Sequence, residues 1–236
     1  MLELKNLSIK YDDVKVIDNV NFTINNGEIC VFLGFTGSGK TSIFNAITNL
    51  IDYDGEIIFN KKPIINKDVK IAMSTQHYDL YNFKNIYQNI ILGLKIKKMP
   101  IDKCYIENLM KSYGMYEHKN KYPNELSGGQ KQKVSFLRSI VQNPSLFLLD
   151  EPFSALDYFT REEMQKELLN YLDKQKCTTL LITHSIEEAL YLGDKIIILG
   201  DNPSTIIEAF DNEKGLDKTS DGFLQKVKET RKLFNI

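Results

Sequence analysis

An octapeptide near the start of the chain constrains its fold more than any other feature. It consists of Gly34, Phe35, Thr36, Gly37, Ser38, Gly39, Lys40 and Thr41. The apolar residues 30–33 before it predict a buried strand, and apolar residues at helical spacing within 41–50 predict a helix after it. Glycines between a strand and a helix let backbone N–H groups converge on a phosphate at the positive end of the helix dipole. A phosphate-binding loop is therefore predicted, the alternative being a glycine-rich turn that only caps a helix.

Two side chains of this loop have chemistry of their own. The Lys40 ammonium reaches the β and γ phosphates of a nucleotide as a point charge. The Thr41 hydroxyl is a ligand for Mg²⁺. The motif therefore predicts that a nucleotide binds together with Mg²⁺.

A second apolar run, residues 146–149, ends in the acid pair Asp150 and Glu151. Ligands of α/β folds bind at the carboxyl edge of the sheet, and a strand that ends at Asp150 brings both acids there. At that edge Asp150 would hold Mg²⁺ directly or through water, and Glu151 would polarise an attacking water. The alternative is an ordinary strand end with solvated acids.

His184 follows a third predicted strand end, residues 180–183, and is expected at the same edge of the sheet. An imidazole at that place hydrogen-bonds a γ phosphate and holds the attacking water in line. A lone histidine after a strand is usually uninformative, but this one follows the acid pair along the chain. His77 and His118 have no such context.

Strand and helix patterns alternate along the chain as an α/β protein requires. Residues 1–28 are β-rich, with alternation at 2–4 and 20–24, and further strands are predicted at 56–59, 69–75, 146–150, 178–183 and 195–199. Residues 78–143 are helical in character, and Pro144 ends the last of these helices. Helical segments between the later strands predict a parallel sheet covered on both faces, in a single domain of residues 1–236 with one more helix at 221–234.

Composition limits the function classes. The 42% hydrophobic and 26% charged fractions are those of a soluble globular protein, and 30 basic against 31 acidic residues leave no electrostatic signal for nucleic acid. Three widely spaced cysteines predict free thiols in a reducing compartment. Neither a signal peptide nor a membrane-spanning run is expected, so work at a membrane would require a partner.

Far downstream, Leu126 is followed by Ser127, Gly128, Gly129 and Gln130. Two glycines at a helix start free several N–H groups to bind an anion, which makes this a second anion-binding element. Because the chain already has a loop for its own nucleotide, the element suggests a head-to-tail pair in which each copy covers the other's γ phosphate. A glycine-rich helix C-cap is the alternative.

These motifs, in this order, resemble those of the ATP-binding subunit of an ABC transporter over nearly the whole chain. The resemblance implies a P-loop NTPase core with a mostly parallel sheet, an N-terminal antiparallel β subdomain and a helical subdomain inserted at about 78–143. It also implies that Gln76 contacts the nucleotide and ligates Mg²⁺, and that Asp157 lies in the D-loop, residues 154–157. Tyr11 would stack on adenine, although a tyrosine there also serves packing. The remaining nucleotide contacts that the resemblance implies are the octapeptide, Ser42 and, from the second copy, Ser127, Gly128, Gly129 and Gln130.

The resemblance further implies an ATPase in which Lys40, Glu151 and His184 carry catalysis, with ATP and Mg²⁺ bound between two identical copies. Integral membrane permease subunits would dock near residues 76–95, together with an extracytoplasmic solute-binding protein, at the cytoplasmic face of the cell membrane. Residues 184–190 and the absence of a long C-terminal extension resemble the nitrate, sulfonate, taurine and thiamine-precursor importer branch. Residues 77–83 depart from that branch, which commonly has an acidic residue and a Pro-Trp pair there.

Three alternatives remain open. An export or lipoprotein-release ATPase would have the same chemistry. A soluble ABC-type ATPase of DNA repair or translation usually has two cassettes, a zinc insertion or coiled coils, and this chain has a single Ser-Gly-Gly-Gln element without such extras. A non-hydrolytic regulatory subunit is disfavoured because Lys40, Asp150, Glu151 and His184 are all present.

Overall fold

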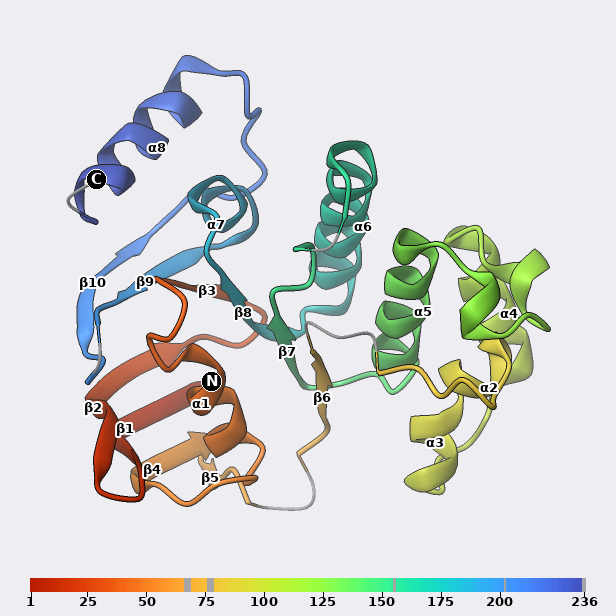
Figure 1. The fold of residues 1–236 in the computed structure, drawn as a ribbon, viewed down its shortest axis with the longest axis horizontal. Helices are drawn as coiled ribbons and strands as arrows, with labels where there is room; N and C mark the ends of the chain where they lie inside the picture. The colour runs from red at the N-terminus through yellow and green to blue at the C-terminus, as the bar shows by residue number, and fades with distance from the viewer. Residues whose placement is uncertain (66–68, 76–78, 155, 202, 235–236) are drawn as a thin grey trace.

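The computed structural model describes residues 1–65, 69–75, 79–154, 156–201 and 203–234. Two β-sheets and the helices around them make up this part of the chain (Figure 1). Within the described residues, no helix combines the length and the apolar character that crossing a bilayer requires.

The first sheet is antiparallel and comes from the N-terminal part of the chain. Its strands are β1 (Leu2–Tyr11), β2 (Val14–Ile24), β4 (Asp54–Phe59) and β5 (Lys62–Pro63), in the order β2-β1-β4-β5. In β1, Leu4 and Leu7 are both buried because the pairing with β2 shifts between them, which resets the alternation of inward and outward side chains. The antiparallel N-terminal sheet that the resemblance implies is thereby confirmed.

The second sheet is mostly parallel, and its strands lie in the order β10-β9-β3-β8-β7-β6. Their bounds are β3 (Ile29–Leu33), β6 (Ile71–Ser74), β7 (Leu146–Asp150), β8 (Thr178–Thr183), β9 (Lys195–Leu199) and β10 (Ile206–Asp211). β10 runs antiparallel to β9, whereas the pairs from β9 to β6 are parallel. This sheet confirms the predicted α/β fold class.

Both faces of the parallel sheet are buried, which explains why its strands are unbroken apolar runs in the sequence. In β7, Leu146 and Leu148 pack with the antiparallel sheet and α1 (Lys40–Ile47). Phe147 and Leu149 pack with helices on the other face. Since successive side chains of a strand point to opposite faces, one strand contributes to both cores.

The helices on that other face are α5 (Gly128–Ile140), α6 (Tyr158–Gln175), α7 (Ile186–Leu192) and α8 (Asp221–Lys232). Between β6 and α5 the chain also forms α2 (Ile86–Ile90), α3 (Leu92–Ile96), α4 (Lys103–Ser112) and 3-10 turns at Tyr116–His118 and Pro123–Glu125. Figure 1 shows α2 to α5 together at one end of the molecule, in agreement with the helical character predicted for residues 78–143. That these helices form a subdomain of their own stays a prediction.

Candidate active site

Three neighbouring strands bring the predicted site residues to one edge of the parallel sheet. β3 leads into the octapeptide, β8 ends before His184, and β7 ends at Asp150. The register pairs Leu33 with Thr183 and Asp150 with Ile182, so the three strands end at the same level. The loop, the acid pair and the histidine are therefore neighbours at the carboxyl edge, where α/β sheets bind ligands.

Glycines give the octapeptide its curvature. Gly37 and Gly39 have φ values of 87° and 75°, in the left-handed region that side chains other than glycine rarely adopt. A Cβ on Gly39 would also lie 2.7 Å from the Ile17 Cδ1 atom of the antiparallel sheet. The loop is thus held against β2, and α1 begins directly after it at Lys40.

Lys40 points into the loop and is only 6% exposed. Its ammonium donates hydrogen bonds to the Gly34 carbonyl at 2.9 Å and to the Ser38 hydroxyl at 3.0 Å. Burial lowers the pKa of Lys40, while the nearby carboxylates of Glu151 and Asp150 act in the opposite direction. A poorly hydrated ammonium inside a ring of backbone groups suits a phosphate as its partner.

Thr41 and Asp150 meet across the edge of the sheet. The Thr41 hydroxyl donates a 2.9 Å hydrogen bond to the Asp150 carboxylate, which is 8% exposed. Burial raises the pKa of Asp150, opposed by the hydrogen bond from Thr41. Two oxygen donors this close together fit Mg²⁺, a hard cation that prefers carboxylate and hydroxyl oxygens. Gln76, the third predicted ligand, lies outside the described residues.

Glu151 and His184 form a second pair beside the first. The Nδ1 atom of His184 lies 3.3 Å from a carboxylate oxygen of Glu151, and the His184 side chain is 58% exposed. Glu151 has a φ of 45°, and its backbone N–H donates to the Ile182 carbonyl at 3.0 Å. A left-handed conformation is uncommon in a glutamate, and the hydrogen bond to β8 holds Glu151 in it.

Two aromatic residues flank the loop. Tyr11 ends β1, and its hydroxyl donates a 3.1 Å hydrogen bond to the hydroxyl of Ser42, while its side chain is 42% exposed. The structure therefore places Tyr11 beside the nucleotide loop, and stacking on adenine stays a prediction. Phe35 contacts Phe234, just after α8, with ring centroids 5.4 Å apart. The sequence alone offers no signal for this contact, because it joins distant parts of the chain.

The Ser-Gly-Gly-Gln element opens a helix. Ser127 is the N-cap of α5: its hydroxyl accepts from the Gln130 N–H at 3.3 Å, and the Gln130 side chain accepts from the Ser127 N–H at 3.1 Å. The alternative of a helix C-cap is thus wrong, and two glycines follow the cap as an anion-binding helix start requires. The Gln130 amide also lies 3.2 Å from a ring nitrogen of His118.

Asp157 opens α6 beside this element. Its carboxylate accepts hydrogen bonds from the Thr160 N–H at 3.1 Å and from the Thr160 hydroxyl at 2.7 Å, and these bonds lower its pKa. A Cβ on Gly129 would lie 3.0 Å from the Thr160 methyl carbon, so the starts of α5 and α6 are in contact. Among residues 154–157, Ala155 lies outside the described part of the chain.

A phosphate-binding loop, an acid pair and a histidine at the carboxyl edge of an α/β sheet define a P-loop nucleotide hydrolase. The family model for ABC transporters matches residues 17–154, and the chain belongs to this family as an ATP-binding subunit and ATPase. Sequence relatives agree with this assignment. The aliphatic sulfonates import ATP-binding protein SsuB of Bacillus anthracis is 34% identical over 90% of this chain and 85% of the relative.

Two further comparisons point the same way. The spermidine/putrescine import ATP-binding protein PotA of Borreliella afzelii is 39% identical over 85% of this chain, which spans 60% of that longer relative. Among solved structures, a dimer of the ATP-binding cassette MJ0796 in a post-hydrolysis state with ADP and Pi has a TM-score of 0.77. It is 26% identical, over 90% of this chain and 99% of that one.

Proposed function

We propose that two copies of this chain close head to tail around two ATP molecules and hydrolyse them to drive solute import through separate membrane subunits. The observation that carries this proposal is the meeting of two residue pairs at one sheet edge, Thr41 with Asp150 and Glu151 with His184. The first pair offers oxygen ligands, and the second offers a base beside a group that can orient the attacking water. Hydrolysis of a phosphoanhydride requires these components.

Each side chain of the site then has one task. Lys40 and the N–H groups of the loop stabilise negative charge that develops on the transferred phosphoryl group. Glu151 accepts a proton from the attacking water, and His184, 3.3 Å away, orients that water and the γ phosphate. Thr41 and Asp150 would hold Mg²⁺, which would supply positive charge to neutralise the phosphates of the nucleotide.

The second half of each site comes from α5 of the other copy. Ser127 and Gly128 are exposed, and the helix end that they open carries positive partial charge. The similar cassette MJ0796 has a dimeric structure with ADP and Pi. Both observations support a site in which Ser127, Gly128, Gly129 and Gln130 of one copy cover the γ phosphate bound by the other, with Asp157 close to the same interface.

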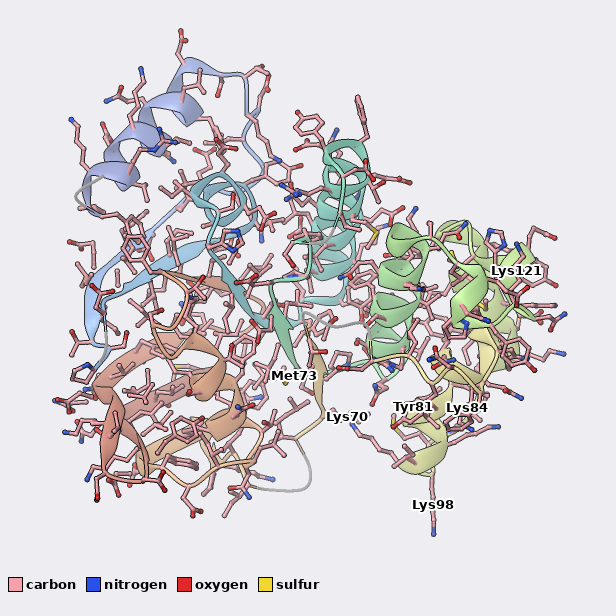
Figure 2. The ribbon with its side chains drawn as sticks, in the orientation of Figure 1. Lys70, Met73, Tyr81, Lys84, Lys98 and Lys121 are labelled. Carbon is pink, nitrogen blue, oxygen red and sulfur yellow. The ribbon has the colours of Figure 1, made fainter. Side chains whose placement is uncertain are left out.

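The membrane subunits, in this proposal, dock near residues 76–95, of which the structure describes 79–95. Figure 2 shows Tyr81 and Lys84 on this segment, at the boundary between Met73 of β6 and the helices α2 and α3. Tyr81 is 44% exposed and Phe83 is 74% exposed, and their ring centroids lie 5.5 Å apart, so the two side chains form one apolar surface that supports a docking role. The protein would then act at the cytoplasmic face of the membrane.

Import is supported by the names of the relatives, which are importers of sulfonates and of polyamines. Because sulfonates are anions and polyamines are cations, these names support import as the direction of transport but do not identify the solute. A sulfonate-like solute rests on the resemblance of residues 184–190 to the nitrate, sulfonate and taurine branch. An extracytoplasmic solute-binding protein belongs to the same proposal.

The test is the E151Q variant, with and without MgATP. Glutamine keeps the side-chain volume and removes the base, so phosphate release should fall by about 100-fold or more while ATP still binds. In size-exclusion chromatography the variant should elute as a dimer with MgATP and as a monomer without it. E213Q, at an exposed position of the chain, serves as the control and should release phosphate at the wild-type rate. Normal turnover by E151Q would exclude Glu151 as the base, and a monomer in MgATP would argue against the head-to-tail pair.

A further inference from the structure

A buried carboxylate lies close to the residues on either side of His184. Glu188 of α7 is 7% exposed, and one of its oxygens accepts a 2.7 Å hydrogen bond from the hydroxyl of Thr183, the residue before the histidine. The same hydroxyl accepts a 3.1 Å hydrogen bond from the N–H of Ser185, the residue after it. Both chain neighbours of His184 are therefore tied to Glu188, directly or through one hydroxyl.

Glu188, Thr183 and Arg161 of α6 form a cluster, and Arg161 connects it to a second loop. Its Nη2 atom donates a 2.9 Å hydrogen bond to the carbonyl of Leu156, in the segment that follows the acid pair. Its Nε atom lies 3.9 Å from the other carboxylate oxygen of Glu188. That Nε atom is buried and has no hydrogen-bond partner among the described residues, so a small approach of α6 to α7 would turn the ion pair into a hydrogen bond.

The position of Glu188 is costly for folding, which argues for a task beyond stability. Burial raises the pKa of this carboxyl, against the opposing effects of the Thr183 hydrogen bond and the Arg161 charge. The start of α7 is already capped by the Ser185 hydroxyl, which accepts from the Glu188 N–H at 3.3 Å. A buried ion pair commonly adds little to stability in comparison with apolar residues.

The cluster also touches the element that we assign to the interface between two copies. Arg161 directly follows Thr160, and Thr160 is in contact with the start of α5 at Gly129. A continuous path of contacts therefore leads from the starts of α5 and α6 through Arg161 and Glu188 to the end of β8. His184, at the end of this path, lies 3.3 Å from Glu151.

We propose that Glu188, with Thr183 and Arg161, is a positioning residue that holds His184 in place for hydrolysis and links it to the segment around Leu156. This inference rests on the proposed role of His184. None of the three side chains touches ATP in this account; each acts through the backbone on either side of the histidine. Loss of the cluster should thus slow the chemical step and leave nucleotide binding intact.

The experiment compares kcat, KM for ATP and thermal unfolding across a matched set of full-length variants. T183V removes the hydroxyl at nearly constant volume, and T183S restores it. E188Q keeps an acceptor for Thr183 and removes the charge that faces Arg161. The controls are T179V, a buried threonine of the same strand whose hydroxyl donates to the Cys177 carbonyl, and E187Q, the exposed neighbour on α7.

We expect kcat of T183V and E188Q to fall by about tenfold to 100-fold, with KM within about twofold of the wild type. T183S should recover most of the loss, both controls should hydrolyse ATP at the wild-type rate, and E188Q should unfold at a temperature no lower than the wild type. An R161M/E188Q double variant should be no slower than E188Q alone, because the two residues act as a unit.

H184A separates this inference from the function on which it rests. If H184A hydrolyses ATP normally, the role of His184 in the proposed function is wrong. If H184A is inactive while T183V and E188Q retain wild-type kcat, the role stands and the positioning inference is overturned. Loss of kcat in E188Q that is matched by T179V or accompanied by a lower unfolding temperature would also overturn it, because a structural defect would then explain the result.

Discussion

Two charged side chains at the centre of the site lie where little water reaches them. Lys40 is 6% exposed and Asp150 is 8% exposed. Burial lowers the pKa of Lys40 and raises the pKa of Asp150, so in both residues it disfavours the charged form. We therefore expect these charges to stabilise a bound nucleotide and its cation more than the folded chain, a common compromise at active sites.

Asp150 allows a test of this compromise through pH. Its pKa is raised in the folded protein, chiefly by burial, above the ordinary 3.8. Between 3.8 and the raised value the folded protein binds more protons than the unfolded chain, so the free energy of unfolding falls as the pH rises through this window. The D150N variant lacks this dependence, and without nucleotide at pH 8 it should unfold at the wild-type temperature or above. Its ATP hydrolysis should fall by about 100-fold or more.

Thermal unfolding measured from pH 4 to pH 8, in steps of roughly one pH unit, reports this dependence. A pKa shift of one unit corresponds to about 1.4 kcal/mol for each proton bound. D13N, at an exposed position near the turn between β1 and β2, is the control and should follow the wild-type curve. A D150N protein that unfolds well below the wild type at pH 8 would show that the charged carboxylate stabilises the fold.

At the level of elements, the parallel strands and the starts of their following segments could be predicted from the sequence. β3, β7 and β8 are buried on both faces, so each is an apolar run that a local pattern reveals. β10 was missed because it is an edge strand with mostly exposed side chains, and β5 because it has two exposed residues. The Arg161–Glu188 pair was missed because α6 and α7 meet only through tertiary packing.

We expect the start of α5 to combine two tasks that a pair of variants can separate. Ser127 caps α5, and Ser220 caps α8 with the same kind of bond, from the Phe223 N–H at 3.3 Å. Removal of either cap in S127A or S220A should cost about 1 kcal/mol of stability. Only S127A should also slow hydrolysis, by about tenfold or more, because its hydroxyl is assigned to the γ phosphate of the second copy.

Urea unfolding of both variants measures the first effect, and steady-state phosphate release measures the second. The result expected is equal loss of stability with unequal loss of activity. Equal activity of S127A and S220A would mean that Ser127 is a helix cap and nothing more.

At the level of the whole molecule, one copy presents the two proposed halves of the site in different places. The phosphate-binding loop precedes α1, which packs between the two sheets, whereas Ser127 opens α5 at the other end of the molecule (Figure 1). A single copy therefore cannot bring its own Ser-Gly-Gly-Gln element to its own nucleotide without a large rearrangement. A two-fold axis, as in the proposed pair, would solve this problem, because each copy would supply the half that the other lacks.

If each site is built from residues of two copies, a mixture of two different inactive variants should regain activity. K40A removes the loop cation and S127R blocks the second half, so each homodimer should be inactive. In a mixed dimer, one site combines the intact loop of the S127R copy with the intact α5 start of the K40A copy. Random mixing in equal amounts makes half of the dimers mixed, each with one of two sites restored, so activity should return to about one quarter of the wild type.

The control for that mixture is a second pair of variants in which both defects lie in the same half of the site. K40A mixed with D150N leaves every nucleotide-binding half damaged, because Lys40 and Asp150 belong to the same half of the proposed site. This mixture should stay inactive at any ratio, although its subunits associate as readily as those of the first. Recovery in neither mixture, together with the absence of a nucleotide-dependent mixed dimer, would mean that each copy builds its site alone. Recovery in both mixtures would mean that Lys40 and Asp150 serve different sites. Either result would require the two-fold arrangement to be abandoned.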